Sequence, residues 1–247
     1  MFPVKAVLLD YIGTLVAPRN YTFEASVLKL YNALYTVGFE AAQPDFLSAY
    51  SKAHEKYRLV RYGELREVTN AVWVSEALCS VGYDVSRDDR RMQEALDLFF
   101  QDFVDSLVLR PYAEELLKHI SENFKVGLIS NFTYAPVVHT SLRQLGIRPY
   151  FDVVVVSEEN GWRKPHKKIF HDTLAKLGVK AEAALYIGDS PIEDIKGAAE
   201  AGLKSVFVSS QFYSFQDLEK SGQKADVVVA DLEELYRRLS EFARVVL

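Results

Sequence analysis

Five short apolar runs in the C-terminal half of the chain constrain its fold more than any other feature. Each run is rich in β-branched residues and lacks a regular alternation of polar and apolar positions. Strands with this pattern are buried on both faces, as the strands of parallel sheets are. The runs are KVGLIS (125–130), FDVVVVS (151–157), AALYIGD (183–189), KSVFVSS (204–210) and ADVVVAD (225–231).

Helical patterns lie between several of these runs, and each pattern ends on a glycine, which is a common stop signal. They are residues 135–146, 166–178 and 191–202. Strands that alternate with helices are joined by right-handed crossovers, which place helices on both faces of the sheet. The sequence therefore predicts an α/β fold with a doubly wound, Rossmann-like parallel sheet, whose first strand ends just before Asp10.

The segment from residue 22 to about residue 106 follows a different pattern. Its apolar residues recur at three- and four-residue spacing, which is typical of amphipathic helices, and it contains no convincing strand. We therefore expect residues 1–15 and 107–247 to form the core and residues 16–106 to form an all-helical cap domain. A solvated loop between two cap helices is expected, with contact to substrate as the alternative, for Tyr57, Arg58, Arg61, Tyr62 and Glu64.

Composition and charge exclude several classes of protein. A formal net charge of -5 argues against a nucleic-acid-binding protein, which usually carries a basic stripe. No apolar run approaches the roughly 18 residues of a membrane span, and the N-terminal run ends too soon for a signal peptide. We therefore expect a cytoplasmic protein, with its oligomeric state open. The single cysteine, Cys79, is expected in a helix as a small packed core residue.

Polar residues stand where the predicted strands end. They are Asp10, Ser130–Asn131, Ser157–Glu158 and Asp189. Ligands of open α/β sheets bind at the carboxyl ends of the strands, so these side chains are expected at one common edge. A helical insertion that leaves the tip of the first strand overhangs the same edge. It can act there as a lid that excludes water and selects substrates.

These residue types suit the transfer of a phosphoryl group. A carboxylate such as Asp10 can attack phosphorus or carbon and form an acyl intermediate. Asp189 and Asp194 flank a strand-to-helix turn and offer the oxygen ligands that Mg²⁺ prefers. The charge of a phosphoryl group needs cations and hydrogen-bond donors around it. The candidate groups that bind phosphate are Thr14, Ser130, Asn131 and Lys164, with Lys164 also a catalytic candidate.

Four motifs follow one another along the chain: D-Y-I-G-T-L (10–15), I-S-N (129–131), W-R-K-P (162–165) and G-D-S-P-I-E-D (188–194). Their order and context resemble the haloacid dehalogenase superfamily, and the phrase SEENGWRKPHKKIFHDTLAKLGV is similar to members with a helical cap after the first strand. The resemblance covers nearly the whole chain. It implies a Mg²⁺-dependent phosphatase that acts on small phosphorylated metabolites through an aspartyl-phosphate intermediate on Asp10. The implied metal ligands are Asp10, Asp189, Asp194 (directly or through water) and the backbone carbonyl of Ile12.

Ile12 departs from the pattern of such phosphatases, which carry a second aspartate two residues after the nucleophile. That aspartate protonates the leaving oxygen and later activates water, whereas the side chain of Ile12 cannot transfer a proton. General acid–base catalysis is typically worth about 10²–10⁴-fold in rate. We therefore expect substrates whose leaving group needs little protonation, or an acid that the cap supplies.

The same substitution leaves three other activities open. A 2-haloacid dehalogenase also lacks the second aspartate, because halide leaves without a proton, but it lacks the metal carboxylates too. A relative of phosphonoacetaldehyde hydrolase would use Mg²⁺ and a cap lysine, with Lys52 and Lys56 as candidates. A degenerate member would bind a phosphometabolite or a protein partner without turnover. Asp189 and Asp194 together favour the phosphatase.

Overall fold

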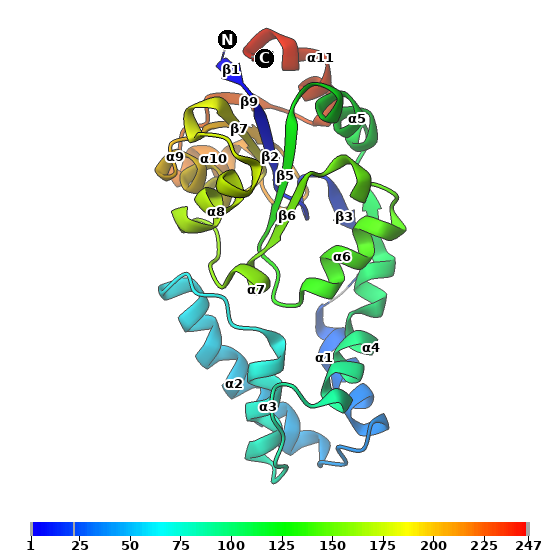
Figure 1. Ribbon diagram of the computed structural model, residues 1–247. Helices are drawn as coiled ribbons and strands as arrows, with labels where there is room; N and C mark the ends of the chain where they lie inside the picture. The colour runs from blue at the N-terminus through cyan, green and yellow to red at the C-terminus, as the bar shows by residue number, and fades with distance from the viewer. Residues whose placement is uncertain (1, 22, 246–247) are drawn as a thin grey trace.

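A six-stranded parallel sheet organises the computed structural model, which describes residues 2–21 and 23–245 (Figure 1). The strand order is β6-β5-β2-β7-β8-β9, so the first of these strands along the chain lies between β5 and β7. The sheet grows from β2 in both directions, and such a switch in direction is where open α/β sheets bind ligands. The strands are β2 (Ala6–Leu9), β5 (Lys125–Ser130), β6 (Val153–Val156), β7 (Ala184–Gly188), β8 (Lys204–Val208) and β9 (Val227–Val229).

Helices cover both faces of the sheet, which confirms the predicted doubly wound α/β fold. Val7 and Leu9 of β2 pack in one apolar cluster with α5 (Ala113–Asn123), α6 (Ala135–Gln144) and α11 (Leu232–Phe242). The alternate residues of β2, Ala6 and Leu8, pack on the opposite face. β2 is therefore buried on both faces. The prediction was wrong for the edge strand β9, in which Val228 is 40% exposed. The helices of that second face are α8 (Lys167–Leu177) and α9 (Gly197–Glu200).

Four helices occupy most of the segment between β2 and β5. They form an apolar cluster of their own, which includes Trp73, Met92 and Phe99. Figure 1 shows these helices gathered at one end of the molecule, while both termini lie at the opposite end. The predicted helical character of this segment is therefore confirmed. The helices are α1 (Phe23–Thr36), α2 (Gln43–Gly63), α3 (Asn70–Ser80) and α4 (Arg90–Ser106).

Two strands that the sequence did not predict join the helical segment to the sheet. The antiparallel pair β3 (Val16–Pro18) and β4 (Leu107–Leu109) forms where the chain leaves the sheet and where it returns. A further parallel pair joins the two ends of the described chain. The remaining elements are β1 (Phe2–Val4), β10 (Ala243–Val245), α7 (Ser157–Asn160), α10 (Phe215–Ser221), the 3₁₀ helices η1 (Arg148–Tyr150) and η2 (Ala181–Ala183), and the π-helix η3 (Pro191–Lys196).

The expected loop at residues 57–64 was wrong, because α2 continues through these residues to Gly63. No proline or glycine interrupts the segment after Pro44, and the inward-facing Arg61 extends the buried stripe of the helix. Cys79 lies in a helix, as predicted, but its side chain is exposed. The adjacent Leu78 takes the buried position on that turn of α3. In the described part of the chain, every helix is too short or too polar to cross a membrane.

Candidate active site

Three carboxylates meet at the carboxyl edge of the sheet. Asp10 directly follows β2, Asp189 directly follows the neighbouring strand β7, and Asp194 lies in the π-helix η3 that comes next. All three side chains are buried, and each offers an oxygen within 4.8 Å of the others. The register that pairs Leu9 with Ile187 explains the first two positions, because it ends the two strands within one residue of each other. The predicted convergence of these three residues is therefore present in the structure.

Lys164 lies between two of these carboxylates. Its ammonium group donates hydrogen bonds to Asp10 Oδ1 at 2.7 Å and to Asp194 Oδ1 at 2.6 Å. The side chain is only 1% exposed, and its Nζ also contacts the Tyr186 hydroxyl at 2.9 Å. Asn131 fixes the backbone of the same lysine: its Nδ2 donates to the Lys164 carbonyl at 2.9 Å and its Oδ1 accepts from the Lys164 N–H at 2.8 Å. The amide of Asn131 thus positions the lysine in this structure.

Burial and mutual repulsion shape the ionisation of the site. Burial raises the pKa of Asp10 to about 6, with Lys164 opposing this rise and Asp194 adding to it. Burial, together with the neighbouring Asp10 and Asp194, raises the pKa of Asp189 to about 8. Burial alone would lower the pKa of Lys164, but Asp10 and Asp194 raise it well above its usual value. Three carboxylates and one ammonium thus leave an excess of negative charge, which protons or a cation must balance.

The residues present fit a divalent cation. Asp10 Oδ2 is buried and has no hydrogen-bond partner among the described residues, so one carboxylate oxygen is available to a ligand. The cluster offers only oxygen donors, which hard cations such as Mg²⁺ prefer to nitrogen or sulfur. A divalent cation would also offset the mutual repulsion of Asp10, Asp189 and Asp194. We conclude that this cluster can hold a divalent metal ion.

Two glycines allow the backbone to pass close to these carboxylates. Gly13 has a φ of +103°, and a Cβ placed on it would lie 2.3 Å from Asp189 Oδ2. A Cβ on Gly188 would lie 2.4 Å from Asp194 Cγ. Both distances are far shorter than any real contact of a Cβ, so any side chain at either position would displace a carboxylate.

The other predicted site residues surround this cluster. The Thr14 hydroxyl donates to Asp189 Oδ1 at 3.3 Å, so it supports a carboxylate in this structure. Ser130 is buried at the end of β5. The Ile12 side chain is half-buried and packs against the core cluster of the sheet. Nothing in the structure tests the role of the Ile12 carbonyl, which stays a prediction.

Several further residues of the site were not predicted. Ser210 Oγ donates to Asp189 Oδ2 at 2.6 Å. The sequence pattern of residues 204–210 predicts only a strand. Arg110 Nη1 donates to the carbonyl of Gly13 at 2.6 Å and thereby supports the loop after β2. Glu67 accepts a hydrogen bond from Arg163 Nη1 at 2.7 Å and ties the helical segment to the sheet beside Lys164. Local sequence gives no signal for these contacts, because each partner is far away along the chain.

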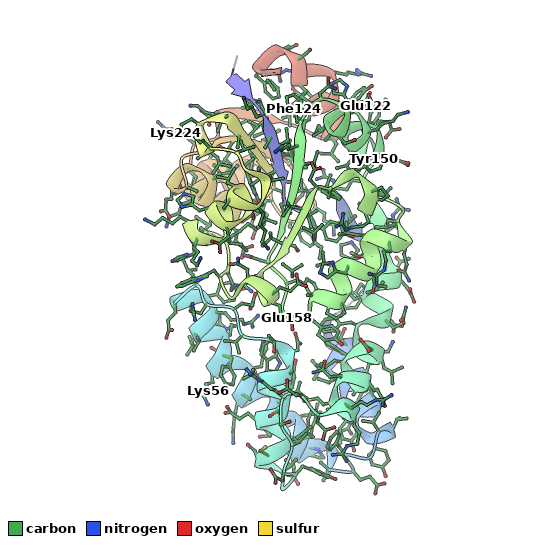
Figure 2. The ribbon with its side chains drawn as sticks, viewed as in Figure 1. Lys56, Glu122, Phe124, Tyr150, Glu158 and Lys224 are labelled. Atoms are coloured by element: carbon green, nitrogen blue, oxygen red, sulfur yellow. The ribbon has the colours of Figure 1, made fainter. Side chains whose placement is uncertain are left out.

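The two cap lysines considered for a Schiff base do not serve the site in this structure. Lys56 is exposed, and its ammonium pairs with Glu76 of α3 at 2.7 Å. Figure 2 shows Lys56 on the outer side of α2, pointing away from the sheet. Lys52 lies on the same helix and is exposed as well.

A hollow of about 550 Å³ adjoins Lys164. Its lining includes Tyr62 of the helical segment, and Ser190, Glu193 and Tyr213 from loops and turns that follow the sheet strands.

Relatives of known activity share parts of this sequence. A glyceraldehyde 3-phosphate phosphatase of Methanothermobacter thermautotrophicus is 32% identical over 58% of this chain and 65% of its own length. The corresponding enzyme of Methanocaldococcus jannaschii is 35% identical over 52% of this chain and 56% of its own length. The chain thus spans less than two thirds of these relatives. A ribulose-1,5-bisphosphate 5-phosphatase of Halopiger xanaduensis is 27% identical over 81% of this chain and 83% of its own length.

Solved structures share the fold. A 2-haloacid dehalogenase of Pseudomonas syringae superposes with a TM-score of 0.64 over 97% of this chain and 100% of its own, at 21% identity. The hydrolase YfnB of Bacillus subtilis, bound to magnesium, superposes with a TM-score of 0.59 over 96% of this chain and 98% of its own, at 22% identity. The sequence profile of haloacid dehalogenase-like hydrolases matches residues 4–202. The chain therefore belongs to the haloacid dehalogenase-like hydrolase family.

Proposed function

We propose that this protein is a Mg²⁺-dependent phosphatase that acts on small phosphorylated metabolites through an aspartyl-phosphate intermediate. The observation that carries the proposal is the buried cluster of Asp10, Asp189 and Asp194 with Lys164 between two of the carboxylates. The names of the relatives support it, because the three described above are phosphatases of phosphorylated sugars. A dehalogenase that displaces halide from carbon needs no metal ion for the departure of halide, so a cluster able to hold a metal ion favours the phosphatase.

In this proposal Asp10 attacks the phosphorus of the substrate. A new bond forms between a carboxylate oxygen of Asp10 and phosphorus, and the bond between phosphorus and the ester oxygen breaks with its electron pair going to the leaving oxygen. Lys164 holds Asp10 in place and stabilises the charge on the transferring group. Ser130, Thr14 and the backbone that Asn131 fixes surround the phosphoryl group. Water then attacks the phosphorus of the aspartyl phosphate and regenerates the carboxylate.

Asp10, Asp189 and Asp194 would hold the Mg²⁺ ion, together with the backbone carbonyl of Ile12. When bound, the ion would neutralise charge on the phosphoryl oxygens and lower the repulsion that they meet in an acidic site. The raised pKa values of Asp10 and Asp189 support this assignment, because they report carboxylates that need a positive partner.

We further propose that residues 16–106 act as a cap over a core made of residues 1–15 and 107–247. The separate apolar cluster of the four helices supports this division, as does the strand pair β3–β4 at the junction. Residues of the helical segment, such as Tyr62 and Leu65, reach the hollow beside Lys164. A cap in this position would enclose the substrate and exclude bulk water from the reacting phosphorus.

The first prediction tests the nucleophile. Asp10→Asn keeps the size of the side chain but removes the attacking carboxylate, so phosphate release should fall to background while the fold is retained. The measurement is phosphate release from acetyl phosphate and p-nitrophenyl phosphate with Mg²⁺, alongside circular dichroism. Asp88→Asn is the matched control, because Asp88 is highly exposed, and it should keep the wild-type rate. Release well above background from folded Asp10→Asn would contradict the assignment.

The second prediction concerns metal binding and pH. A protonated carboxyl group does not ligate Mg²⁺, and the metal-free pKa of Asp189 is about 8. Affinity for Mg²⁺ should therefore rise from pH 6 to pH 8, by up to about 10-fold per pH unit where binding releases one proton, and level off above. Titration calorimetry at pH 6, 7, 8 and 9 measures this. Asp189→Asn should lose most of the affinity, whereas an affinity that does not change with pH would count against the proposed ligand.

The third prediction concerns the close approach of the chain to Asp189. Gly13→Ala should lose Mg²⁺ binding, because the new Cβ displaces the carboxylate. Gly38→Ala is the matched control: its φ of +98° is similar, but a Cβ there meets nothing within 4 Å. Both variants should lose about 1–3 kcal/mol of stability through backbone strain. Urea unfolding and calorimetry separate the two effects, and equal metal affinity in both variants would disprove the steric argument.

The fourth prediction concerns the leaving group. Because the Ile12 side chain supplies no proton, kcat/KM should depend steeply on leaving-group pKa, and aryl and acyl phosphates should react faster than alkyl phosphates. Ile12→Asp should raise kcat/KM for alkyl phosphates by about 10-fold or more and for aryl phosphates by less. The test compares both substrate classes in both proteins. A wild-type rate that is independent of leaving-group pKa would show that another group acts as the acid.

A further inference from the structure

A second cavity lies within the helical segment, apart from the hollow beside Lys164. Its volume is about 230 Å³, which is below the roughly 300–1,000 Å³ of pockets that hold a whole ligand. Residues of α2, α3, α4 and the loop after β5 line it. The cavity is therefore sized for one part of a larger molecule, and its walls come from the helical segment and from the loop after β5.

Arg61 is the charged residue that faces this cavity. Arg61 is only 8% exposed, and among the described residues no carboxylate forms an ion pair with it. Its Nη2 lies 3.4 Å from His54 Nε2, its Cζ lies 4.9 Å from the centre of the Trp73 ring, and its Nε has no hydrogen-bond partner. Buried arginines are rare without a partner, because burial removes the water that stabilises the charge. Arg61 therefore offers a donor that a ligand can use.

Asn70 offers the complementary group. It is 4% exposed, and its side-chain Oδ1 is buried without a hydrogen-bond partner. An unsatisfied buried acceptor costs desolvation free energy unless a ligand donates a hydrogen bond to it. Trp73 Nε1 is a third buried polar atom of this lining without a partner among the described residues. The three unpaired atoms thus call for a ligand that carries acceptors for Arg61 and Trp73 and a donor for Asn70.

The remaining walls favour a flat ring. Aromatic side chains are attracted to the faces and edges of other rings, and they surround most of this cavity. Such walls disfavour a phosphate dianion, because one arginine would leave it under-neutralised in an apolar site. The aromatic residues that line the cavity are Tyr21, Tyr50, Trp73, Phe99, Phe100, Phe103 and Phe132.

The cavity is close along the chain to the proposed catalytic groups. Phe132 and Thr133 line it, and they directly follow Asn131, whose side chain holds the backbone of Lys164. The Asn70 N–H donates to the Thr133 carbonyl at 3.2 Å, which fixes α3 against this loop. Consecutive Cα atoms are about 3.8 Å apart, so the loop spans only a short distance from Asn131 to the cavity wall. The cavity therefore borders the same loop that positions Lys164.

We propose that this cavity binds the leaving portion of the substrate, and that this portion is a single planar heterocycle with a carbonyl oxygen and a ring N–H on one edge. The carbonyl accepts from Arg61, the N–H donates to Asn70, and the aromatic side chains hold the ring. A pyrimidine nucleoside 5′-monophosphate is the simplest compound of this class. The inference rests on the proposed phosphatase function and narrows its substrate.

The experiment compares uridine 5′-monophosphate with ribose 5-phosphate, which is the same ester without the ring. Wild-type kcat/KM should be about 10-fold or more higher for the nucleotide, since the ring adds hydrogen bonds to buried groups. Arg61→Met should bring the ratio of the two kcat/KM values close to one. Arg58→Met is the matched control on the same helix, because Arg58 is exposed and pairs with Glu55, and it should keep the wild-type ratio.

Binding to the Asp10→Asn variant, measured by calorimetry, separates this inference from the proposed function. The nucleotide should bind about 10-fold tighter than ribose 5-phosphate, whether or not the wild-type protein releases phosphate. If neither compound nor p-nitrophenyl phosphate is hydrolysed, the phosphatase proposal fails, and the binding comparison still decides the inference. Equal affinity for the two compounds would overturn it. Tighter, Arg61-dependent binding of 3-phosphoglycerate would overturn it as well, because Arg61 would then recognise a carboxylate.

Discussion

The buried contact between Lys164 and the carboxylates of Asp10 and Asp194 is the interaction on which the rest of the site depends. Its two distances, 2.7 and 2.6 Å, join three elements that are far apart in the sequence. One ammonium cannot balance three carboxylates, so the site keeps an excess of negative charge. The fold holds this charge in place instead of dispersing it, as is expected where a cation and a phosphoryl group are to be bound.

The geometry that keeps these groups together follows from the sheet. The neighbouring parallel strands β2 and β7 end within one residue of each other, so Asp10 and Asp189 need no long loop to meet. Gly13 and Gly188 then permit a spacing that no other residue would allow. Outside the cluster, Arg110 holds the loop after β2 through carbonyl groups, and Ser210 holds Asp189 from the neighbouring strand end. The spacing of the carboxylates is therefore set mainly by fixed backbone positions.

Strand positions could be predicted from the sequence because a doubly buried strand has a recognisable composition, and the strand ends led directly to Asp10, Asp189 and Asn131. The contacts of Ser210, Arg110 and Glu67 could not be predicted from the sequence, because each joins segments that lie far apart along the chain. The pair β3–β4 was missed because three-residue strands carry too little pattern to detect. The sequence predicts an early end of α2 because polar residues such as Arg61 are usually exposed to solvent. In the structure the Arg61 side chain is buried, and it lines the cavity within the helical segment.

Ile12 and Arg61 both bear on how well the transition state for a poor leaving group is stabilised. Ile12 provides no general acid, and Arg61 would add binding energy through the proposed contact with the leaving portion. An enzyme without a general acid loses transition-state stabilisation for poor leaving groups, by about 10²–10⁴-fold. Binding energy from a remote part of the substrate can offset such a loss in kcat/KM, provided that it orients the reacting group and is retained in the transition state. A ring held by Arg61 and Asn70 would supply binding energy of this kind, beside the loop that carries Asn131. Under the proposed function, the absence of an acid side chain at position 12 would make recognition of the leaving portion more important, and it would place substrate selectivity in the helical segment.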